Sequence, residues 1–511
     1  MTEKPDNRED EILRAAELLA AIAEDRRILA NVSLELRLKL LIAAGRVSQP
    51  DRKAQRQLAK EFRRNEKNEI KAVDEEALSK TGQRIARRAP VFRTPRALPP
   101  GEAPAEAEPV AELKEARKCY VCKVRFTQVH HFYPSMCMAC AEFNWEKRQQ
   151  TADLTGRVAI VTGARVKIGY QASIMLLRAG AHVIATTRFP RDAATRYANE
   201  VDYESWKDRI EVYGVDLRHT PSVEAFCKHI DATHTRLDYI LNNACQTVRR
   251  PVGFYGHLME KETQPLHALS PAEKHVVQEH ERLRAGNSSV LSAETTSEAR
   301  AYLARARDAA IHDSAALSQI ALLEEDLDRG AHLFPAGALD QDLQQVDLRD
   351  RNSWRLTLAE VSAAELLEVH LVNAVAPFIL NARLKSLMAR TNAGDKHIVN
   401  VSAMEGQFYR AYKTDKHPHT NMAKAALNMM TRTSAPDYRR DGIHMNSVDT
   451  GWVTDEDPAV LAERKTVEHG FHPPLDIVDG AARICDPIFS GIRTGEHVWG
   501  QFLKDYKSTD W

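Results

Sequence analysis

The stretch that most constrains the fold of this chain runs from Val158 to Ala179 and reads VAIVTGARVKIGYQASIMLLRA. Its first four residues form a short apolar run, typical of a parallel strand that is covered on both faces. After Thr162 and Gly163, apolar residues recur from Ile168 at roughly helical spacing. The first N–H groups of such a helix face the turn, where the helix dipole favours negative charge. The stretch therefore predicts a strand, a phosphate-holding turn and a helix.

The turn TGARVKIG resembles the T-G-x-x-x-G-x-G fingerprint of the short-chain dehydrogenase/reductase (SDR) family. Lys167 stands where the family has its middle glycine. Its side chain either blocks the approach of the backbone to the phosphate or supplies an ammonium to it, and we favour the ammonium. The resemblance implies that the cofactor contacts from this turn are Thr162, Gly163, Arg165, Lys167, Ile168 and Gly169.

The second strand, Val183 to Thr186, bears on the choice of cofactor. At its end the family keeps an acidic residue that binds the adenosine ribose of NAD, and this chain has Thr187 there. Arg188 follows and suits a 2′-phosphate, helped by Arg165 in the turn. NADP(H) is therefore favoured over NAD(H). The alternative is that Arg188 is a surface arginine without a partner.

Three later motifs extend the resemblance in the expected order. The third predicted strand ends in Asp-Leu, the fourth in Asn-Asn-Ala, and the sixth in a Thr-Gly-Trp turn that replaces the usual Pro-Gly wall over the nicotinamide. These motifs imply further cofactor contacts from Asp216, Leu217, Asn243, Ala244, Gly451 and Val453, and the predicted active-site helix adds Lys424.

Three residues resemble the catalytic set of the family. Ser402 follows the fifth predicted strand and would hold a carbonyl oxygen of the substrate. Lys424, in the next helix, would bind the nicotinamide ribose and lower a nearby pKa. Asn373, in the helix before that strand, would support a proton-relay water. Thr420 stands where the family has its acid/base tyrosine.

The change to Thr420 matters chemically. A phenol of pKa ~10 can be lowered by a neighbouring ammonium until it exchanges protons near neutrality, and an aliphatic hydroxyl cannot. If there is chemistry, another group donates the proton. Our choice is Tyr412, which lies beside Lys413 and close in sequence to the active-site helix, although it also reads as an ordinary loop tyrosine. The alternatives are Tyr409, His417 and His419.

The first 96 residues are rich in Ala, Leu, Glu, Lys and Arg and predict a helical N-terminal region. Its basic half, after Pro50, suggests either an RNA- or partner-binding surface or a solvated helical hairpin. We favour the hairpin, because aromatic residues for base stacking are almost absent. Residues 97–112, rich in Pro, Ala and Glu, predict a linker.

Residues 113–150 predict a small zinc-binding module. Two Cys-x-x-Cys turns can present four thiolates to one Zn²⁺, which leaves no open position and makes a structural site. The odd count of seven cysteines argues against a disulfide framework. A redox pair, or a histidine (His130 or His131) in place of one thiolate, is the alternative. The predicted ligands of about one zinc per chain are Cys119, Cys122, Cys137 and Cys140.

Residues 151–511 predict the SDR-like domain, interrupted by a helical insertion at about 250–355. Helical periodicity is clearest at 271–285 and 295–327. The insertion leaves the sheet after the fourth strand, at the end where the ligand lies, so it forms either a lid or a partner surface. The predicted fold class is α/β: a Rossmann-type doubly wound parallel sheet with a helical N-terminal region and a zinc module.

The composition of the chain bears on which classes of partner are expected. The 511 residues carry zero formal net charge and are 43% hydrophobic, which points neither to nucleic acid nor to a membrane. No apolar run reaches the ~20 residues of a spanning helix, and the first residues lack a secretory h-region, so a cytoplasmic protein is expected.

Two functions follow from the sequence. The first is an NADP(H)-dependent oxidoreductase acting on a small carbonyl or alcohol substrate. The second is a catalytically disabled SDR-like module that binds dinucleotide and uses the helical arm or the insertion to bind a protein partner. A homo-oligomer is compatible with the resemblance, since the family commonly pairs through helices near the active site.

Overall fold

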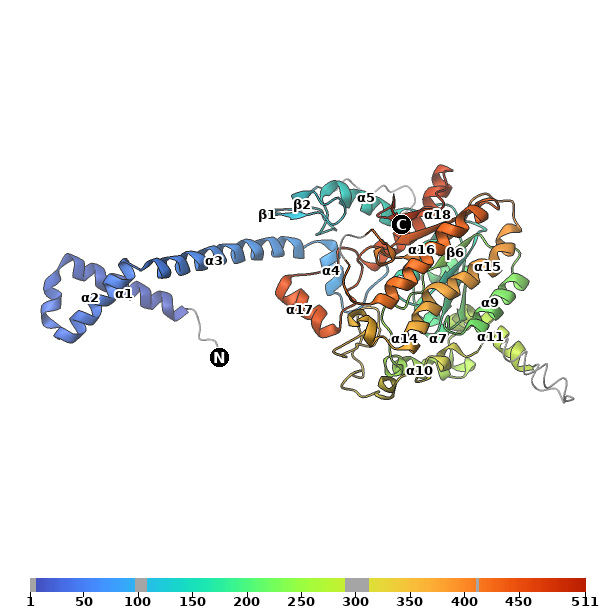
Figure 1. Cartoon of the computed structure of the whole chain (residues 1–511), viewed down its shortest axis with the longest axis horizontal. Coiled ribbons are helices and arrows are strands. Elements are labelled where there is room, and N and C mark those ends of the chain that lie inside the picture. The colour runs from blue at the N-terminus through green and yellow to red at the C-terminus, as the bar shows by residue number, and fades with distance from the viewer. Residues whose placement is uncertain (1–5, 97–107, 290–311, 410–412) are drawn as a thin grey trace. The chain divides into compact units, whose positions relative to one another are not determined.

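The computed structural model describes residues 6–96, 108–289, 312–409 and 413–511 (Figure 1). The chain forms two compact units, residues 1–74 and 75–511. The first unit contains α1 (Asp6–Glu24), the 3-10 turn Arg26–Asn31, α2 (Leu34–Ser48) and the beginning of α3 (Arg52–Ser79). Ser33 caps α2 by accepting a hydrogen bond from the Leu36 N–H at 3.3 Å.

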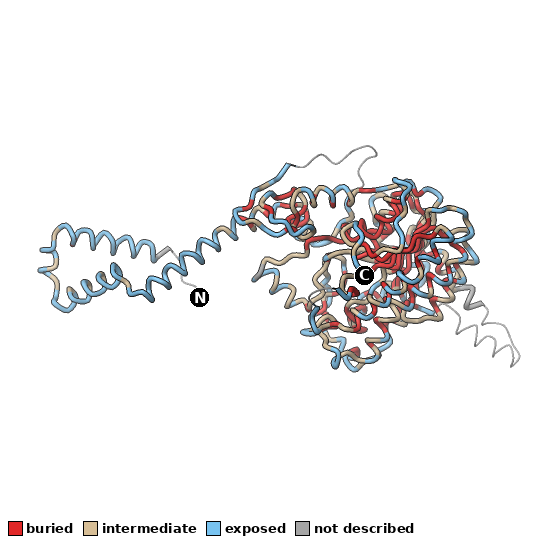
Figure 2. The backbone as a smooth tube through the Cα atoms, turned by 45° about the horizontal axis from the view of Figure 1, so that its top comes forward, coloured by how far each residue is buried: buried red, intermediate tan, exposed pale blue. Residues whose placement is uncertain are grey.

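The first unit has almost no core of its own. Between residues 8 and 73, Ile22 is the single buried side chain, and Figure 2 shows the backbone of these helices mostly in the colour of exposed residues. Apolar side chains of α2 such as Leu34, Leu38 and Leu41 are at least half exposed. The predicted helices are therefore present, with their apolar residues largely uncovered within the unit.

The second unit is built on an eight-stranded sheet in the order β10-β9-β8-β7-β6-β3-β4-β5. All neighbouring strands from β5 to β9 pair parallel, and β10 pairs antiparallel with β9. The direction of strand addition reverses between β3 and β6, which is the switch point where such sheets bind ligands. The strands are β3 (Val158–Thr162), β4 (His182–Thr187), β5 (Ile210–Gly214), β6 (Tyr239–Asn242), β7 (Lys396–Ser402), β8 (Ile443–Asp449), β9 (Phe502–Lys504) and β10 (Lys507–Thr509).

Helices cover both faces of this sheet. Alternate residues of β3 enter two separate cores: Ala159 and Val161 pack on one face and Ile160 on the other. Helices α6 and α18 supply the first core, and α9 and α15 the second. This doubly wound, three-layer arrangement confirms the predicted fold class. The helices of this unit are α4 (Gly82–Arg88), α5 (Met138–Gln149), α6 (Lys167–Arg178), α7 (Pro190–Ala198), α8 (Tyr203–Trp206), α9 (Thr220–Thr233), α10 (Gly256–Thr263), α11 (Pro271–Ser289), α13 (Ser314–Leu317), α14 (Ala363–His370), α15 (Ala376–Ala389), α16 (Pro418–Arg439), α17 (Ala459–His469) and α18 (Ile477–Thr494).

The cysteine-rich module consists of the antiparallel pair β1 (Ala111–Lys118) and β2 (Arg125–Val129), followed by α5. It is fixed to the start of α18 by buried ion pairs, in which Arg148 lies 2.6 Å from Asp476 and 2.8 Å from Asp479. The predicted linker mostly falls on residues 97–107, outside the described residues. Its last two positions belong to β1, because Ala111 pairs with Val129.

The insertion is less helical than its sequence suggests. The first predicted helix, 271–285, is present as α11. Of the second, 295–327, the part before residue 312 lies outside the described residues, and the rest holds only α13 and the 3-10 turn Glu324–Leu327, so a continuous helix is wrong there. The Asp326 carboxylate accepts hydrogen bonds from the Leu322 and Leu323 N–H groups, which competes with helical bonding.

One helical stretch, Ala363–Ala389, is long and apolar enough to cross a membrane by length and composition alone, contrary to the expectation from the length of apolar runs. Leu380, Leu384 and Leu387 on this stretch are fully buried in the second core of the sheet. These contacts account for part of its apolar character, whereas Leu367 and Phe378 on the same stretch are 62% and 61% exposed.

Candidate active site

A cleft of about 1440 Å³ lies at the carboxyl ends of the parallel strands. Every predicted cofactor residue except Thr162 lines it. Thr162 lies directly behind the lining, where its Oγ1 accepts a hydrogen bond from the Ala244 N–H at 3.0 Å. The fold therefore gathers motifs that are up to about 290 residues apart in sequence around one cleft.

The two glycines of the turn are required by its geometry. Gly163 has φ +66°, and a Cβ there would lie 2.8 Å from the Ala244 Cα. A Cβ at Gly169 would lie 2.3 Å from Asn243 Nδ2 and 2.4 Å from the Gly163 oxygen. The helix can therefore meet the strand ends this closely only without side chains at both positions. Asn243 fixes the turn by donating to the Thr162 carbonyl at 3.0 Å.

Lys167 begins α6 with φ +56°, a left-handed conformation that costs a non-glycine residue ~1–2 kcal/mol. This explains why the related fingerprint has glycine at this place. Its side chain lines the cleft and makes no hydrogen bond or close ion pair with the described residues, although its charge acts on the Asp342 carboxylate of the insertion. Val166, which precedes the helix, provides no side-chain cap. The first N–H groups of α6 and one ammonium are thus left for an anion.

The two arginines assigned to a 2′-phosphate differ in their surroundings. Arg165 is buried, lies 2.7 Å from Asp192 and donates to Gln344 of the insertion at 2.6 Å, so its charge is already compensated. Arg188 donates to the Tyr255 hydroxyl at 2.5 Å and stacks on that ring at 4.5 Å. Within the described residues Arg188 makes no close ion pair, although its charge acts on the Asp216 carboxylate, so Arg188 is the less compensated of the two arginines.

The carboxylate of Asp216 is engaged by a neighbour. Arg218 Nη2 lies 2.7 Å from Asp216 Oδ2, and the same guanidinium reaches Glu368. Burial disfavours the charged form, but the hydrogen bonds from Arg218 outweigh it and lower the pKa of Asp216. Asp216 therefore lies in the cleft as a fixed anion, with Leu217 buried beside it.

Asn373 and Lys424 occupy special backbone surroundings. Asn373 lies in a π-helical turn, Leu371–Val375, where its Nδ2 donates to the Val369 carbonyl at 2.8 Å and to the Gln246 carbonyl at 3.2 Å. Lys424 Nζ, on α16, donates to the Val401 carbonyl at the end of β7 at 2.8 Å. Ser402 and Lys424 line the cleft, whereas Asn373 lies behind it.

Several buried polar atoms near the end of β7 and α16 lack a hydrogen-bond partner among the described residues, and they include Ser402 Oγ, Thr420 Oγ1 and Asn373 Oδ1. An unpaired buried polar group costs about 1–3 kcal/mol, so such atoms are usually satisfied by a ligand or by water. The free hydroxyls together with the glycine turn fit a bound nicotinamide dinucleotide and substrate.

The proton-donor candidates separate clearly. Tyr412 lies outside the described residues. Tyr409 is 82% exposed and is not among the lining residues of the cleft. His419 is buried beside Glu365, at 3.3 Å, and is not a lining residue either.

His417, by contrast, lines the cleft one turn before Thr420. Its ring stacks on Trp354 with centroids 3.8 Å apart and planes 5° from parallel, and its backbone has φ +43°. Burial lowers the pKa of His417 below its ordinary value. Its neutral form is therefore the main one at neutral pH.

Two groups of lining residues carry no motif that marks them individually as cleft residues. Residues 340–355 of the insertion form one wall of the cleft, which favours the lid over the partner surface. Tyr120 and Lys123, from the first Cys-x-x-Cys turn, form part of another. The Tyr120 hydroxyl accepts a hydrogen bond from the Trp452 N–H at 3.0 Å, beside Gly451. The cysteine module therefore supports the predicted wall over the nicotinamide.

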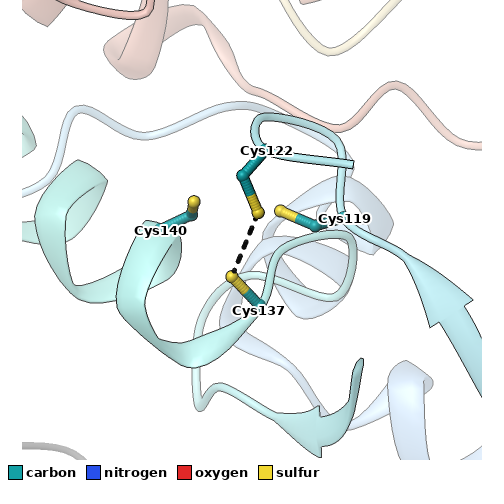
Figure 3. Close-up of side chains that lie close together, drawn as sticks. All are labelled: Cys119, Cys122, Cys137 and Cys140. Carbon is teal, nitrogen blue, oxygen red and sulfur yellow. Dashed lines mark hydrogen bonds between the residues drawn. The ribbon is translucent and has the colours of Figure 1, made fainter. Parts of the chain in front are cut away.

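The four cysteines of the module converge, as Figure 3 shows. Their Sγ atoms all lie within 4.8 Å of one another, and those of Cys122 and Cys137 are 3.6 Å apart. Tetrahedral Zn²⁺ with ~2.3 Å bonds needs sulfurs ~3.8 Å apart, so the set fits that ion. The Val124 N–H lowers the pKa of Cys122 to about 7. Burial raises the pKa of Cys137 and Cys140, which a bound cation would reverse.

Comparison with known proteins agrees with this site. Residues 157–264 match the family model described as short chain dehydrogenase, and residues 351–472 match the one described as Enoyl-(Acyl carrier protein) reductase. The chain belongs to the SDR family. It has the fold of an SDR oxidoreductase, with a cleft for a nicotinamide cofactor. The segment between the two matched regions falls within the insertion.

Individual relatives differ in how much of the chain they share. An uncharacterized protein of Acanthamoeba polyphaga mimivirus is 28% identical over 406 residues, which cover 76% of this chain and 74% of that protein. Retinol dehydrogenase 11 of Mus musculus is 33% identical over 109 residues, 20% of this chain and 34% of that enzyme. The structure of NADPH-bound carbonyl reductase from chicken fatty liver is 15% identical with a TM-score of 0.40, covering 70% of this chain and 100% of that one.

Proposed function

We propose that this protein is an NADP(H)-dependent oxidoreductase that moves a hydride to or from a small carbonyl or alcohol substrate in the cytoplasm. The observation that carries the proposal is the cleft itself. A glycine turn and an uncapped helix N-terminus lie at one end, and the buried, unpartnered hydroxyls of Ser402 and Thr420 lie at the other.

The preference for NADP(H) rests on Arg188. Its guanidinium lies at the end of β4, is held by Tyr255 and makes no close ion pair in the described part of the chain. Arg188→Ala should weaken NADPH binding by ~1.5–3 kcal/mol, about 10–100-fold, and NADH binding much less. Arg250→Ala is the matched control, because Arg250 also lines the cleft but already pairs with Asp347. Equal losses for both cofactors would contradict the preference.

The bound dinucleotide would supply or accept the hydride at its nicotinamide ring. The Ser402 hydroxyl would hold the carbonyl oxygen by donating a hydrogen bond to it. Lys424 would bind the nicotinamide ribose, and Asn373 would position a water for proton relay. Reduction then adds one hydride to the carbonyl carbon and one proton to its oxygen.

Proton donation is the step at which this chain departs from its family, because Thr420 replaces the usual tyrosine. We assign it to Tyr412, as the sequence favours, with His417 as the competing donor because it lines the cleft. We further propose that Cys119, Cys122, Cys137 and Cys140 hold one structural Zn²⁺, which shapes the turn that carries Tyr120 to the cleft.

A second function is favoured by a separate observation, the apolar side chains that α2 exposes in the first unit. A disabled SDR-like module could bind dinucleotide through the same cleft and a protein partner through these helices. One experiment separates the two functions: titration with NADPH, followed by a turnover screen across aldehydes, ketones and quinones. Turnover supports the enzyme, whereas tight NADPH binding without turnover of any class supports the binding module.

A further inference from the structure

A cluster of two histidines and one glutamate lies at the end of the sheet where the parallel strands begin, opposite the cleft. His182 is the first residue of β4, Glu211 is near the start of β5, and His234 directly follows α9. His182 Nε2 lies 2.9 Å and His234 Nε2 lies 3.6 Å from the same carboxylate oxygen, Glu211 Oε1. All three potential ligand atoms lie within 4.8 Å of one another. A simple ion pair with Glu211 would need only one imidazole, whereas here two imidazoles converge on the same carboxylate oxygen.

We propose that His182, Glu211 and His234 form a second metal site, for a divalent transition metal such as Zn²⁺. Imidazole nitrogens and a carboxylate oxygen are ligands that this class of ion prefers. With bonds of ~2.0–2.1 Å in tetrahedral geometry, neighbouring ligand atoms lie ~3.3 Å apart. The distances of 2.9 and 3.6 Å from the two imidazoles to the Glu211 oxygen bracket that value, and the two imidazole nitrogens lie within 4.8 Å of one another.

The surroundings of the cluster orient its ligands. The Tyr213 hydroxyl donates to the other glutamate oxygen, Oε2, at 2.9 Å, and His229 Nε2 lies 3.3 Å from that hydroxyl. Thr233 Oγ1 lies 3.0 Å from His234 Nδ1, which leaves Nε2 to face the glutamate. Hydrogen bonds to the outer atoms of metal ligands are the usual way in which proteins fix such sites.

The ligand number sets the character of the site. Three protein ligands leave a fourth position for water or an anion, and the side chains of His182, Glu211 and His234 are 28%, 18% and 15% exposed, so solvent reaches that position. We expect this site to bind metal more weakly than the four cysteines. Metal here would tie together the amino-terminal ends of β4 and β5 and the end of α9, far from the reacting groups.

Titration of the metal-stripped full chain with Co²⁺ distinguishes the two sites. Cobalt bound by thiolates shows intense sulfur-to-metal charge-transfer absorption, which cobalt bound by nitrogen and oxygen lacks. We expect two equivalents, the first with this absorption and the second without it. Glu211→Gln and His234→Asn should each remove only the second equivalent, and replacement of Cys119 and Cys137 by Ser should remove only the first.

Two further variants sharpen the test. Tyr213→Phe should weaken the second equivalent by about 10–100-fold without abolishing it. His275→Ala is the control, because His275 also faces a carboxylate, Asp208, at 3.1 Å, but has no third ligand among the described residues, and it should change nothing. One equivalent in the unmodified chain, or a second that survives in both Glu211→Gln and His234→Asn, would overturn the proposal. Circular dichroism shows whether each variant is folded.

Discussion

Replacement of Lys167 by Gly tests the most unusual position of the cofactor turn, because it should change stability and affinity in opposite directions. Lys167 has φ +56° at the first position of α6. Glycine adopts this conformation freely, whereas a side chain there costs ~1–2 kcal/mol. Lys167→Gly should therefore raise the free energy of unfolding of the unliganded protein by ~1 kcal/mol.

Cofactor affinity should fall in the same variant. The Lys167 ammonium lines the cleft beside the open N–H groups of α6 and makes no close ion pair in the described part of the chain. Loss of one charge-assisted contact with a phosphate is worth ~1.5–3 kcal/mol, which corresponds to an increase in Kd of about 10–100-fold. The difference from the unmodified protein should shrink at high salt, because exposed charge contacts are screened.

Lys167→Ala is the matched control, since it removes the ammonium and keeps a Cβ in the left-handed conformation. Both variants should lose NADPH affinity equally, and Lys167→Gly alone should gain thermal stability. The measurements are thermal unfolding without ligand and NADPH fluorescence titration at two salt concentrations. If Lys167→Gly binds NADPH as tightly as the unmodified protein, or more tightly, the side chain obstructs the phosphate and our interpretation of Lys167 is wrong.

Three further outcomes are expected. Replacement of both Cys119 and Cys137 by Ser should remove about one tightly held zinc per chain by elemental analysis, and unchanged metal content would contradict the assigned ligands. If turnover exists, Tyr412→Phe should lower kcat by ~10²–10⁴-fold with NADPH affinity nearly unchanged, and Thr420→Ala should matter less. A fully active Tyr412→Phe variant would leave water or histidine as the donor. Tyr120→Phe removes the acceptor of the Trp452 N–H and should weaken NADPH binding by ~0.5–1.5 kcal/mol at constant zinc content; an unchanged Kd would mean that this contact does not hold the wall.

What the sequence determined by itself is local. The strand, turn and helix from Val158 to Ala179 follow from the change of apolar period and from two glycines, and the structure shows why Gly163 and Gly169 cannot carry side chains. The paired Cys-x-x-Cys turns likewise place their thiolates by short-range geometry. Such patterns can be read directly because each motif contains most of the atoms that constrain it.

Other features depend on residues that meet only in the folded chain. The sequence suggests that Arg165 binds a phosphate. In the structure, however, its guanidinium forms an ion pair with Asp192 and donates a hydrogen bond to Gln344. Tyr120 lies between two cysteines and reaches the cleft only because the module packs on the start of α18.

The insertion shows the same limit in its secondary structure. Helical periodicity extends through residues 312–327, but Asp326 bonds the backbone N–H groups of Leu322 and Leu323 and forms an ion pair with Arg249 at 2.6 Å. The histidine–glutamate cluster also has no linear motif, because His182 and Glu211 are 29 residues apart and become neighbours through the pairing of β4 with β5. Tertiary structure decided these points because the partner that fixes each side chain lies far away in the sequence and is selected by packing.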